Sequence, residues 1–372
     1  MKTVLSIFCG MILVGSITAQ DARINQTEEL NRRRDLKVGT PHLSELREEE
    51  QVPEIIPGDR NDLGPQYIVK RKQIRRWWDV KFDTQYLYTS NMLLQANNWH
   101  NKVVDTTLLA STAEFSFAPD PIQVGANALF PKIGFRHQWF NYALGDTQPM
   151  FRYAGDTPQE DVRGYNRFDF DSQTIFGNLT YLVDEKWIFG LGFDFTRLLT
   201  HEKVDDTPPD QSQNYSEFYK EYVPSCSVAR IFQITPVTMA VIGYEGKLRY
   251  TDSDNNNSVD DLDGTDRHEL NNRLDSILSL SVRQQIVPTV FVQPFARLQY
   301  SNYNINDHRQ DLVYRNREDI TFTGGSSFSW EVTDWFTVSC FGSYEERTST
   351  AERIEEYDKF DLGGGLSASL RF

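Results

Sequence analysis

The residue types best suited to proton transfer in this chain occur as two His-Glu steps, which begin at His201 and His268. A histidine and a carboxylate act as base and acid only when both reach the same substrate atoms. Neither histidine is followed by a serine two residues later, and His137 is followed by Gln138 and Trp139. Because no nucleophile is paired with a base, we expect the protein not to be an enzyme. Hydrolysis at the bases of surface loops is the alternative.

The acidic segment of twelve residues over 252–263 has the oxygen-bearing side chains that a calcium ion prefers. Oxygens fall at positions 1, 3, 5, 9 and 12 of the segment, which is the spacing of a calcium-binding loop. Asn257 stands in place of the turn glycine, and an aspartate replaces the final bidentate glutamate. The alternative is a solvated acidic loop, and no other cofactor is expected. The candidate ligands are Asp252, Asp254, Asn256 and Asp263.

Composition excludes three classes of protein. The chain has 372 residues, 39% of them hydrophobic, and no apolar run after residue 20 is long enough for a membrane helix. It also contains 24 Phe, 17 Tyr and 7 Trp, which is too aromatic for a disordered acidic protein. A net charge of −15 argues against a nucleic-acid partner. An aromatic chain with a mean hydropathy of −0.53 fits a soluble β protein or a membrane barrel.

The first residues predict export. Met1-Lys2 precedes an apolar run over 4–14, and small residues precede Gln20, so residues 1–19 are predicted to be a signal peptide cleaved after Ala19. Only Cys226 and Cys340 would remain, with no disulfide framework or metal spacing.

Residues 20–76 are charged and contain four prolines, which predicts a periplasmic extension that is mostly disordered. At best one short helix is expected, between Pro41 and Pro53. A plug or a binding segment is the alternative. The basic residues over 70–76 precede Trp77-Trp78 and could hold anionic headgroups, or form a plain linker.

Period-2 alternation begins at Trp77, where apolar Trp78, Val80 and Phe82 interleave with charged residues. About twelve such segments follow over 77–372. Short connections near 118–126, 183–185, 234–236, 285–287 and 332–333 alternate with long ones near 90–102, 143–165, 199–216, 252–266, 302–316 and 347–359. We therefore predict an all-β fold, a transmembrane antiparallel up-and-down β-barrel. A soluble double-sheet sandwich is the alternative.

Aromatic residues mark both ends of the predicted strands, as the interfacial girdles of a membrane barrel do. The short-connection end has Trp77, Trp78, Trp187, Trp330 and Trp335, and the long-connection end has Tyr88, Tyr142, Tyr250, Tyr300 and Tyr344.

Charged residues of both signs are predicted to line the lumen. Paired charges would close the interior, whereas separated charges would form a conducting constriction. We expect a cation preference because the loops are acidic; an arginine-lined constriction would reverse it. The candidates are Lys81, Arg136, Arg167, Asp169, Asp194, Glu245, Lys247, Arg249, Arg273, Asp275, Arg283 and Arg297, with Asp171 and Arg230 as further members.

The last strand, over 365–372, resembles the C-terminal recognition strand of bacterial outer-membrane proteins. The apolar phase of this strand consists of Leu366, Ala368, Leu370 and Phe372. The resemblance implies that the barrel-assembly machinery recognises the strand. The opening strand, over 86–93, is similar to the start of putative β-barrel porins, although Ser90 replaces their usual aspartate. Together these implicate the bacterial outer membrane, with both termini in the periplasm.

We expect a porin-like channel for passive diffusion of small polar solutes, with outer-membrane lipid as its surroundings. The alternative from another class is a non-conducting structural or surface-binding barrel that acts through its long acidic loops.

Overall fold

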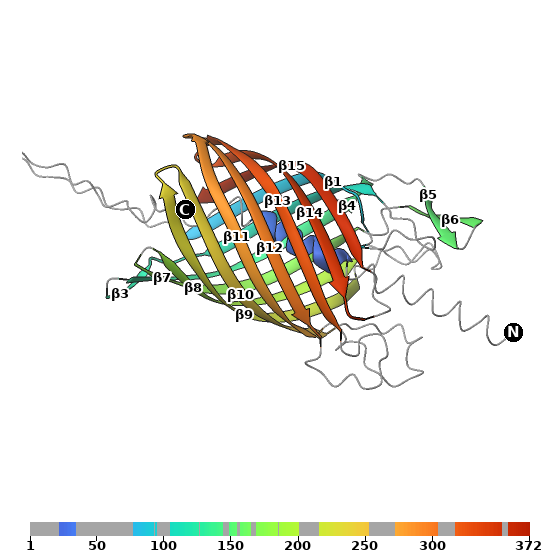
Figure 1. Cartoon of the computed structure of the whole chain (residues 1–372), viewed down its shortest axis with the longest axis horizontal. Coiled ribbons are helices and arrows are strands. Elements are labelled where there is room, and N and C mark those ends of the chain that lie inside the picture. Colours follow the sequence, from blue (N-terminus) through green and yellow to red (C-terminus); the bar gives the residue numbers. More distant parts are fainter. Residues whose placement is uncertain are drawn as a thin grey trace, which may run out of the picture.

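The computed structural model describes residues 22–34, 77–92, 94, 105–125, 127–143, 149–154, 157–164, 169–184, 186–200, 216–252, 272–303, 317–351 and 356–372. Twelve antiparallel strands close into a barrel (Figure 1). They are β1 (Trp78–Thr89), β2 (Thr106–Phe117), β4 (Asn127–Tyr142), β7 (Phe170–Val183), β8 (Trp187–Thr200), β9 (Ser216–Thr235), β10 (Thr238–Asp252), β11 (Arg273–Val287), β12 (Val290–Asn302), β13 (Glu318–Thr333), β14 (Phe336–Ser349) and β15 (Tyr357–Arg371).

Each strand pairs with its neighbours in sequence order, and β1 pairs with β15 to close the barrel. The prediction of an up-and-down barrel is confirmed, and the sandwich alternative is wrong. Three short strands lie in predicted connections. β3 (Ile122–Val124) pairs with the start of β4, while β5 (Pro149–Ala154) and β6 (Thr157–Gly164) form a separate hairpin.

The connections divide the barrel into two ends, which we call the short-turn end and the long-loop end. The β7–β8, β9–β10, β11–β12 and β13–β14 turns lie at the short-turn end, together with the start of β1 and the end of β15. Asp184 adopts a positive φ of 51° in the tight β7–β8 turn. The connections that follow β1, β4, β8, β10, β12 and β14 lie at the long-loop end.

The outer surface is apolar because alternate side chains of each strand point away from the lumen. Leu191, Ile133 and Leu278 are 60%, 56% and 51% exposed, whereas Asp275 and Gln138 on the lumen phase are fully buried. This is the inverse of a soluble barrel and is typical of a membrane barrel.

Aromatic residues at the two ends largely follow the prediction. Trp78, Trp187, Trp330 and Trp335 are exposed at the short-turn end, and Tyr88, Tyr250, Tyr300 and Tyr344 are exposed at the long-loop end. Tyr142 is an exception: it is 1% exposed and lies in the cluster of buried residues inside the barrel. Strand phase therefore excludes Tyr142 from the outer girdle.

One helix, over 22–34, lies inside the barrel, and we call it the lumen helix (Figure 1). Its Ala22 packs with Leu94 and Tyr357 at the long-loop end, whereas Arg34 contacts Glu114 toward the short-turn end. Its thirteen residues span about 20 Å, which is most of the height of a membrane barrel's apolar band. No helix among the described residues is long and apolar enough to cross a membrane.

The position of the lumen helix corrects the expectation for residues 22–34 and fits the alternative of a plug. Residues 22–34 were predicted to lie in a charged, mostly disordered periplasmic segment, but they are helical and enclosed by strands. Their charged side chains have partners on the lumen wall, which compensates for their removal from water. The short helix predicted between Pro41 and Pro53 and the basic run over 70–76 lie outside the described residues.

Candidate functional site: the charged lumen and its helix

The lumen helix combines a small apolar contact with many polar ones. Ile24 and Leu30 join a buried cluster that includes Leu87 of β1, Phe140 of β4 and Phe341 of β14. Within the helix, Glu29 forms ion pairs with Arg32 and Arg33, at the spacings where helical side chains meet. Burial by itself would raise the pKa of Glu29, but Arg32, Arg33 and Lys359 together hold that pKa well below its ordinary value.

The β14–β15 wall binds one side of the helix. Arg33 forms an ion pair with Asp361, and its guanidinium lies 4.3 Å from the ring centre of Phe341. Asn25 donates from Nδ2 to Glu345 Oε1 at 2.9 Å and accepts from Lys359 Nζ at 2.7 Å. Both ends of the Asn25 amide are therefore engaged by the same pair of strands.

The β9–β11 wall binds a second side of the helix through Glu28. Its carboxylate lies 2.7 Å from Arg249 and 3.2 Å from Arg273. Arg249 also pairs with Glu221 at 2.9 Å and with Asp275 at 2.6 Å. The arginine thus links the helix to three neighbouring strands.

The β2–β4 wall binds a third side, near the end of the helix. Arg34 lies 2.7 Å from Glu114, whose carboxylate also pairs with Lys132 at 2.9 Å and Arg136 at 3.2 Å. Asn31 Oδ1 accepts from Arg136 and from Gln138, both at 3.0 Å. The helix is consequently held around most of its circumference, and removing one partner of such a buried ion pair costs roughly 3–5 kcal/mol.

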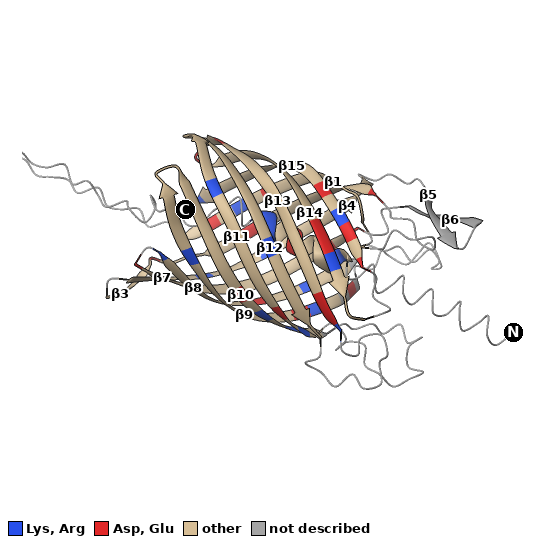
Figure 2. Cartoon of the chain, in the orientation of Figure 1, with Lys and Arg blue, Asp and Glu red and all other residues tan. Residues whose placement is uncertain are grey.

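Both signs of charge occur on the strands of the barrel (Figure 2). Most of the predicted lumen residues line interior cavities. A single large cavity has in its lining Arg136, Asp194, Glu245, Lys247, Arg249 and Arg297. Arg273 lines a second cavity, and Asp275 is fully buried beside it. Lys81 lies 3.8 Å from Asp79, and Arg283 lies 3.3 Å from Glu331, toward the short-turn end.

Four of the predicted residues differ from this arrangement or fall outside it. Asp169 accepts a hydrogen bond from the Tyr142 backbone at 2.7 Å, so it joins two strand ends at the rim. Arg230 is a correction: it lies on the outer face of β9, with its guanidinium 5.0 Å from the ring centre of Trp187. Arg167 lies outside the described residues.

Asp171 is a second correction, because it lies on the outer face of β7. It belongs there to a group that we call the outer-face polar cluster, which consists of His137, Asp171, Gln173, Arg197 and Glu217. His137 Nε2 lies 3.0 Å from Asp171, and His137 Nδ1 lies 3.3 Å from Gln173 Nε2. Arg197 donates twice to Gln173 Oε1, at 2.9 and 2.7 Å, and lies 3.6 Å from Glu217. Both ring nitrogens of His137 are thus engaged. The cluster lies toward the long-loop end, beyond the apolar outer surface of the same strands.

Sequence reasoning missed every helix residue of the site, and also Glu114, Glu345, Lys359 and Asp361 on the wall. Glu114, Glu345 and Asp361 lie on the polar phase of predicted strands, so alternation was the signal that could have found them. Lys359 fell in the predicted connection over 347–359, because β15 begins earlier than predicted. The helix had a weaker signal in the spacing of Glu29 and Arg33.

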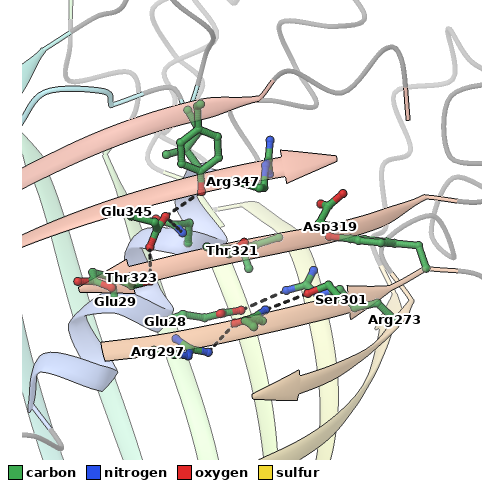
Figure 3. A pocket seen from close by; sticks show the side chains of 16 residues that line it. Glu28, Glu29, Arg273, Arg297, Ser301, Asp319, Thr321, Thr323, Glu345 and Arg347 are labelled. Carbon is green, nitrogen blue, oxygen red and sulfur yellow. Dashed lines mark hydrogen bonds and ion pairs between the residues drawn. The ribbon is translucent and has the colours of Figure 1, made fainter. Parts of the chain in front are cut away.

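Two cavities remain beside the lumen helix. The larger has a volume of about 520 Å³ and lies between the helix and the wall from β4 through β12. The smaller, of about 60 Å³, lies between the helix and the wall from β11 through β15 and shares Ile24, Glu28 and Arg297 with the larger one. Figure 3 shows Glu345, Arg347 and Asp319 on the strands that face Glu28 and Glu29 across this smaller cavity.

Among solved structures, the chain is similar to the β domain of the Bordetella autotransporter BrkA, with 13% identity, coverage of 80% of this chain and 99% of that one, and a TM-score of 0.42. It is also similar to an outer membrane channel from Pseudomonas putida F1, with 11% identity, 85% and 100% coverage, and a TM-score of 0.42.

LpxR from Salmonella typhimurium is a third similar structure, at 9% identity, 77% and 99% coverage, and a TM-score of 0.37. No family model matches the chain, and no curated protein matches it. These likenesses concern the barrel and assign no activity to its lumen.

The remaining predicted sites have mixed outcomes. Asp252 ends β10, and the rest of the predicted calcium loop lies outside the described residues, as do His201 and His268. Within the described ranges, no group of three or more His, Cys, Asp or Glu residues could hold a metal ion. Cys226 and Cys340 are free and exposed.

The predicted assembly strand forms β15, which pairs with β1. Val80 lies opposite Leu370, and Phe82 lies opposite Ala368. Phe372 exchanges backbone hydrogen bonds with Trp78 at 2.8 and 3.2 Å, and its side chain is 59% exposed. Leu366 is likewise exposed on the outer face. The apolar phase of the last strand therefore faces away from the lumen.

Proposed function

We propose that the protein is an outer-membrane channel for passive diffusion of small polar solutes, and that the lumen helix sets the width of the path. The apolar exterior supports placement in a membrane, and the predicted signal peptide supports export to the outer membrane. On this proposal the short-turn end and both ends of the barrel sheet face the periplasm.

The observation that carries the proposal is the cavity of about 520 Å³ beside the helix. A barrel of about twelve strands is wider than its side chains alone can fill, so a helix and a polar space fit together inside it. Arg136, Asp194 and Lys247 are among the charged residues that line this space. Such residues can replace part of the hydration shell of a polar solute in transit.

Conductance in planar bilayers tests the proposal. We expect small channel events from the full mature chain, and larger events from a variant that lacks residues 22–34. If well-folded protein gives no events in either form, the channel function is wrong. If deletion leaves the conductance unchanged, the helix does not set the width of the path.

Exclusion of neutral solutes by size gives a second measurement. In liposome swelling, the full chain should admit small sugars slowly and exclude larger ones, whereas the variant without residues 22–34 should admit both. Equal permeation of both sizes through the full chain would contradict a narrowing role for the helix.

A further inference from the structure

The lining of the cavity of about 520 Å³ beside the lumen helix contains more cationic than anionic side chains. Seven of its lining side chains are Lys or Arg, and four are Asp or Glu. The wall contributes from β4 and from β7 through β12, and the helix contributes Glu28, Arg32 and Arg34. This imbalance is local, because the chain as a whole has a net charge of −15.

The acidic residues of the cavity already have cationic or hydrogen-bonding partners. Glu28 lies 2.7 Å from Arg249, and Glu221 lies 2.9 Å from the same guanidinium. Glu221 also accepts from the Tyr219 hydroxyl at 3.0 Å. Glu245 lies 3.2 Å from Lys247. Asp194 is also engaged by another group of the protein. These carboxylates are therefore engaged. Glu29, Glu114 and Asp275, just outside the lining, pair with five of the seven lining cations, and Lys247 pairs with Glu245. Arg297 is the lining cation with no carboxylate among its described contacts.

Cations are concentrated at two corners of the cavity. At one corner, Glu114 is shared among Arg34, Lys132 and Arg136, so three cations surround one carboxylate. At the other, Arg297 lies close enough to Arg32 to repel it. Arg297 donates to the neutral amide of Gln299 at 2.6 Å, which compensates no charge.

Arg32 has further hydrogen-bonding capacity. Its guanidinium pairs with Glu29 through Nη2 and lies 4.6 Å from the ring centre of Phe295, while its Nε and Nη1 are buried without a hydrogen-bond partner among the described residues. Buried donors without acceptors are costly, so an added anion that draws the side chain toward itself would be favourable.

We propose that this cavity binds small organic solutes that carry two or more negative charges. The inference rests on the proposed channel function, since it names the class of solute that the channel favours. A volume of about 520 Å³ lies in the range of small-ligand sites. Phe176, Leu198 and Ile277 supply an apolar part of the lining for a carbon skeleton. The expected selectivity is opposite to the cation preference predicted from the acidic loops, because the lumen acts on a solute at closer range.

Calorimetric titration of the full mature chain in detergent, with citrate as the probe, tests the proposal. We expect saturable binding that weakens as salt is added, and no binding of sorbitol, which is similar in size but uncharged. Arg297→Gln should weaken citrate binding about tenfold, because a charge-assisted hydrogen bond is lost. Arg297→Lys should retain most of the affinity, which guards against a variant that merely folds badly.

Arg230→Gln is the matched control, since it removes one arginine from the outer face and leaves the lumen unchanged. Absence of citrate binding, or an equal loss in Arg297→Gln and Arg230→Gln, would overturn the anion site. Inorganic phosphate, titrated in parallel, should bind more weakly than citrate; equal binding would mean that charge alone is recognised, without an organic skeleton.

The two proposals can fail separately. Channel events with no citrate binding would leave the channel function standing and overturn the anion site. Citrate binding by a protein that gives no channel events would leave the anion site standing and overturn the channel function.

Discussion

Arg33 of the lumen helix forms an ion pair with Asp361 of β15, a residue 328 positions later in the chain. Asp361 lies opposite Thr89 of β1, at the seam where the first and last strands close the barrel. The helix is therefore fixed to the one strand pair that joins the two ends of the sheet. Helix docking and barrel closure consequently share a contact, although the helix contributes nothing to the strand ladder itself.

Asp361→Asn should release the lumen helix while the barrel remains closed. The substitution removes the carboxylate on the wall that pairs with the buried Arg33 and leaves only the Glu29 pair within the helix, which costs roughly 3–5 kcal/mol of docking free energy. We expect more frequent and larger conductance events in planar bilayers. Asp358→Asn is the matched control, because Asp358 lies on the exposed face of the same strand. Equal conductance in both variants would show that the Arg33 pair does not hold the helix.

A covalent link between the helix and the wall should keep the path narrow. Asn25 and Glu345 are joined by a hydrogen bond of 2.9 Å between side-chain ends, so cysteines at both positions suit a short bifunctional maleimide better than a disulfide. With Cys226 and Cys340 replaced by serine, Asn25→Cys/Glu345→Cys should cross-link within the folded protein and fix the conductance at its low value.

The control for this experiment pairs Asn25→Cys with Asp358→Cys, whose side chain lies on the outer face of β15. This pair should give no intramolecular cross-link. Efficient cross-linking of the control, or a large conductance from the cross-linked Asn25–Glu345 protein, would contradict the position of the helix.

The charge on Glu29 predicts how helix docking depends on pH. Its pKa is lowered in the docked helix, so its contribution to docking is fully present above the ordinary glutamate pKa and is lost as the pH falls below it. Arg32, Arg33 and Lys359 face this carboxylate, and the acidic Glu345 lies near it. We expect constant conductance between about pH 5 and 8 and an increase below about pH 4.

Glu29→Gln should already conduct more at pH 7 and should respond less to acid than the unmodified chain. The remaining response would come from other carboxylates on the wall. A midpoint near pH 6 in the unmodified chain would mean that Glu29 does not control docking.

Alternation along the strands made the barrel predictable, whereas the lumen helix depends on contacts that no local pattern reveals. Trp78, Val80 and Phe82 share the outer face because side chains of a strand alternate regardless of tertiary context. Residues 22–34 read as a solvated charged segment because their partners on the wall are distant in the sequence: Arg136 lies 105 positions after Asn31, and Asp361 lies 328 positions after Arg33. The apolar contribution of Ile24 and Leu30 is too small to signal burial by itself.

Arg230 and Asp171 show where residue type misled the assignment. Both lie on the outward phase of their strands: Asp171 pairs with the exposed Trp139, and Arg230 stands two residues before the exposed Phe232. Phase alone would have placed them correctly. Arg230 remains on the outer surface because its guanidinium stacks on aromatic rings at the short-turn end, where headgroups of a membrane would lie.

Gly363 lies at the seam, where β1 and β15 approach each other closely. A Cβ on Gly363 would lie 2.5 Å from the Tyr86 backbone oxygen and 2.6 Å from the Leu87 Cβ. Gly363→Ala should therefore weaken closure by about 1–3 kcal/mol, through overpacking. Heat-dependent mobility on a gel measures this, with unfolding expected at a lower temperature. Gly177→Ala is the matched control, since nothing lies within 4 Å of its added Cβ. Equal midpoints for the two variants would contradict the close approach.

We expect the side chain of the terminal Phe372 to matter for assembly of the barrel but not for the stability of the folded barrel. Its backbone completes the pairing with Trp78, but its side chain is 59% exposed on the outer surface, so the folded barrel gains little packing from it within the chain. If the apolar last strand is read by the barrel-assembly machinery, Phe372→Ala should lower the amount of folded protein in the outer membrane severalfold. Protein refolded in detergent should keep its unfolding midpoint, because the backbone hydrogen bonds remain. Trp335→Ala, which removes a similarly exposed aromatic at the same end of the barrel, serves as the control and should assemble normally. Normal membrane levels of Phe372→Ala would show that the terminal ring is not the recognised feature, and an equal loss for Trp335→Ala would assign the effect to the aromatic girdle instead.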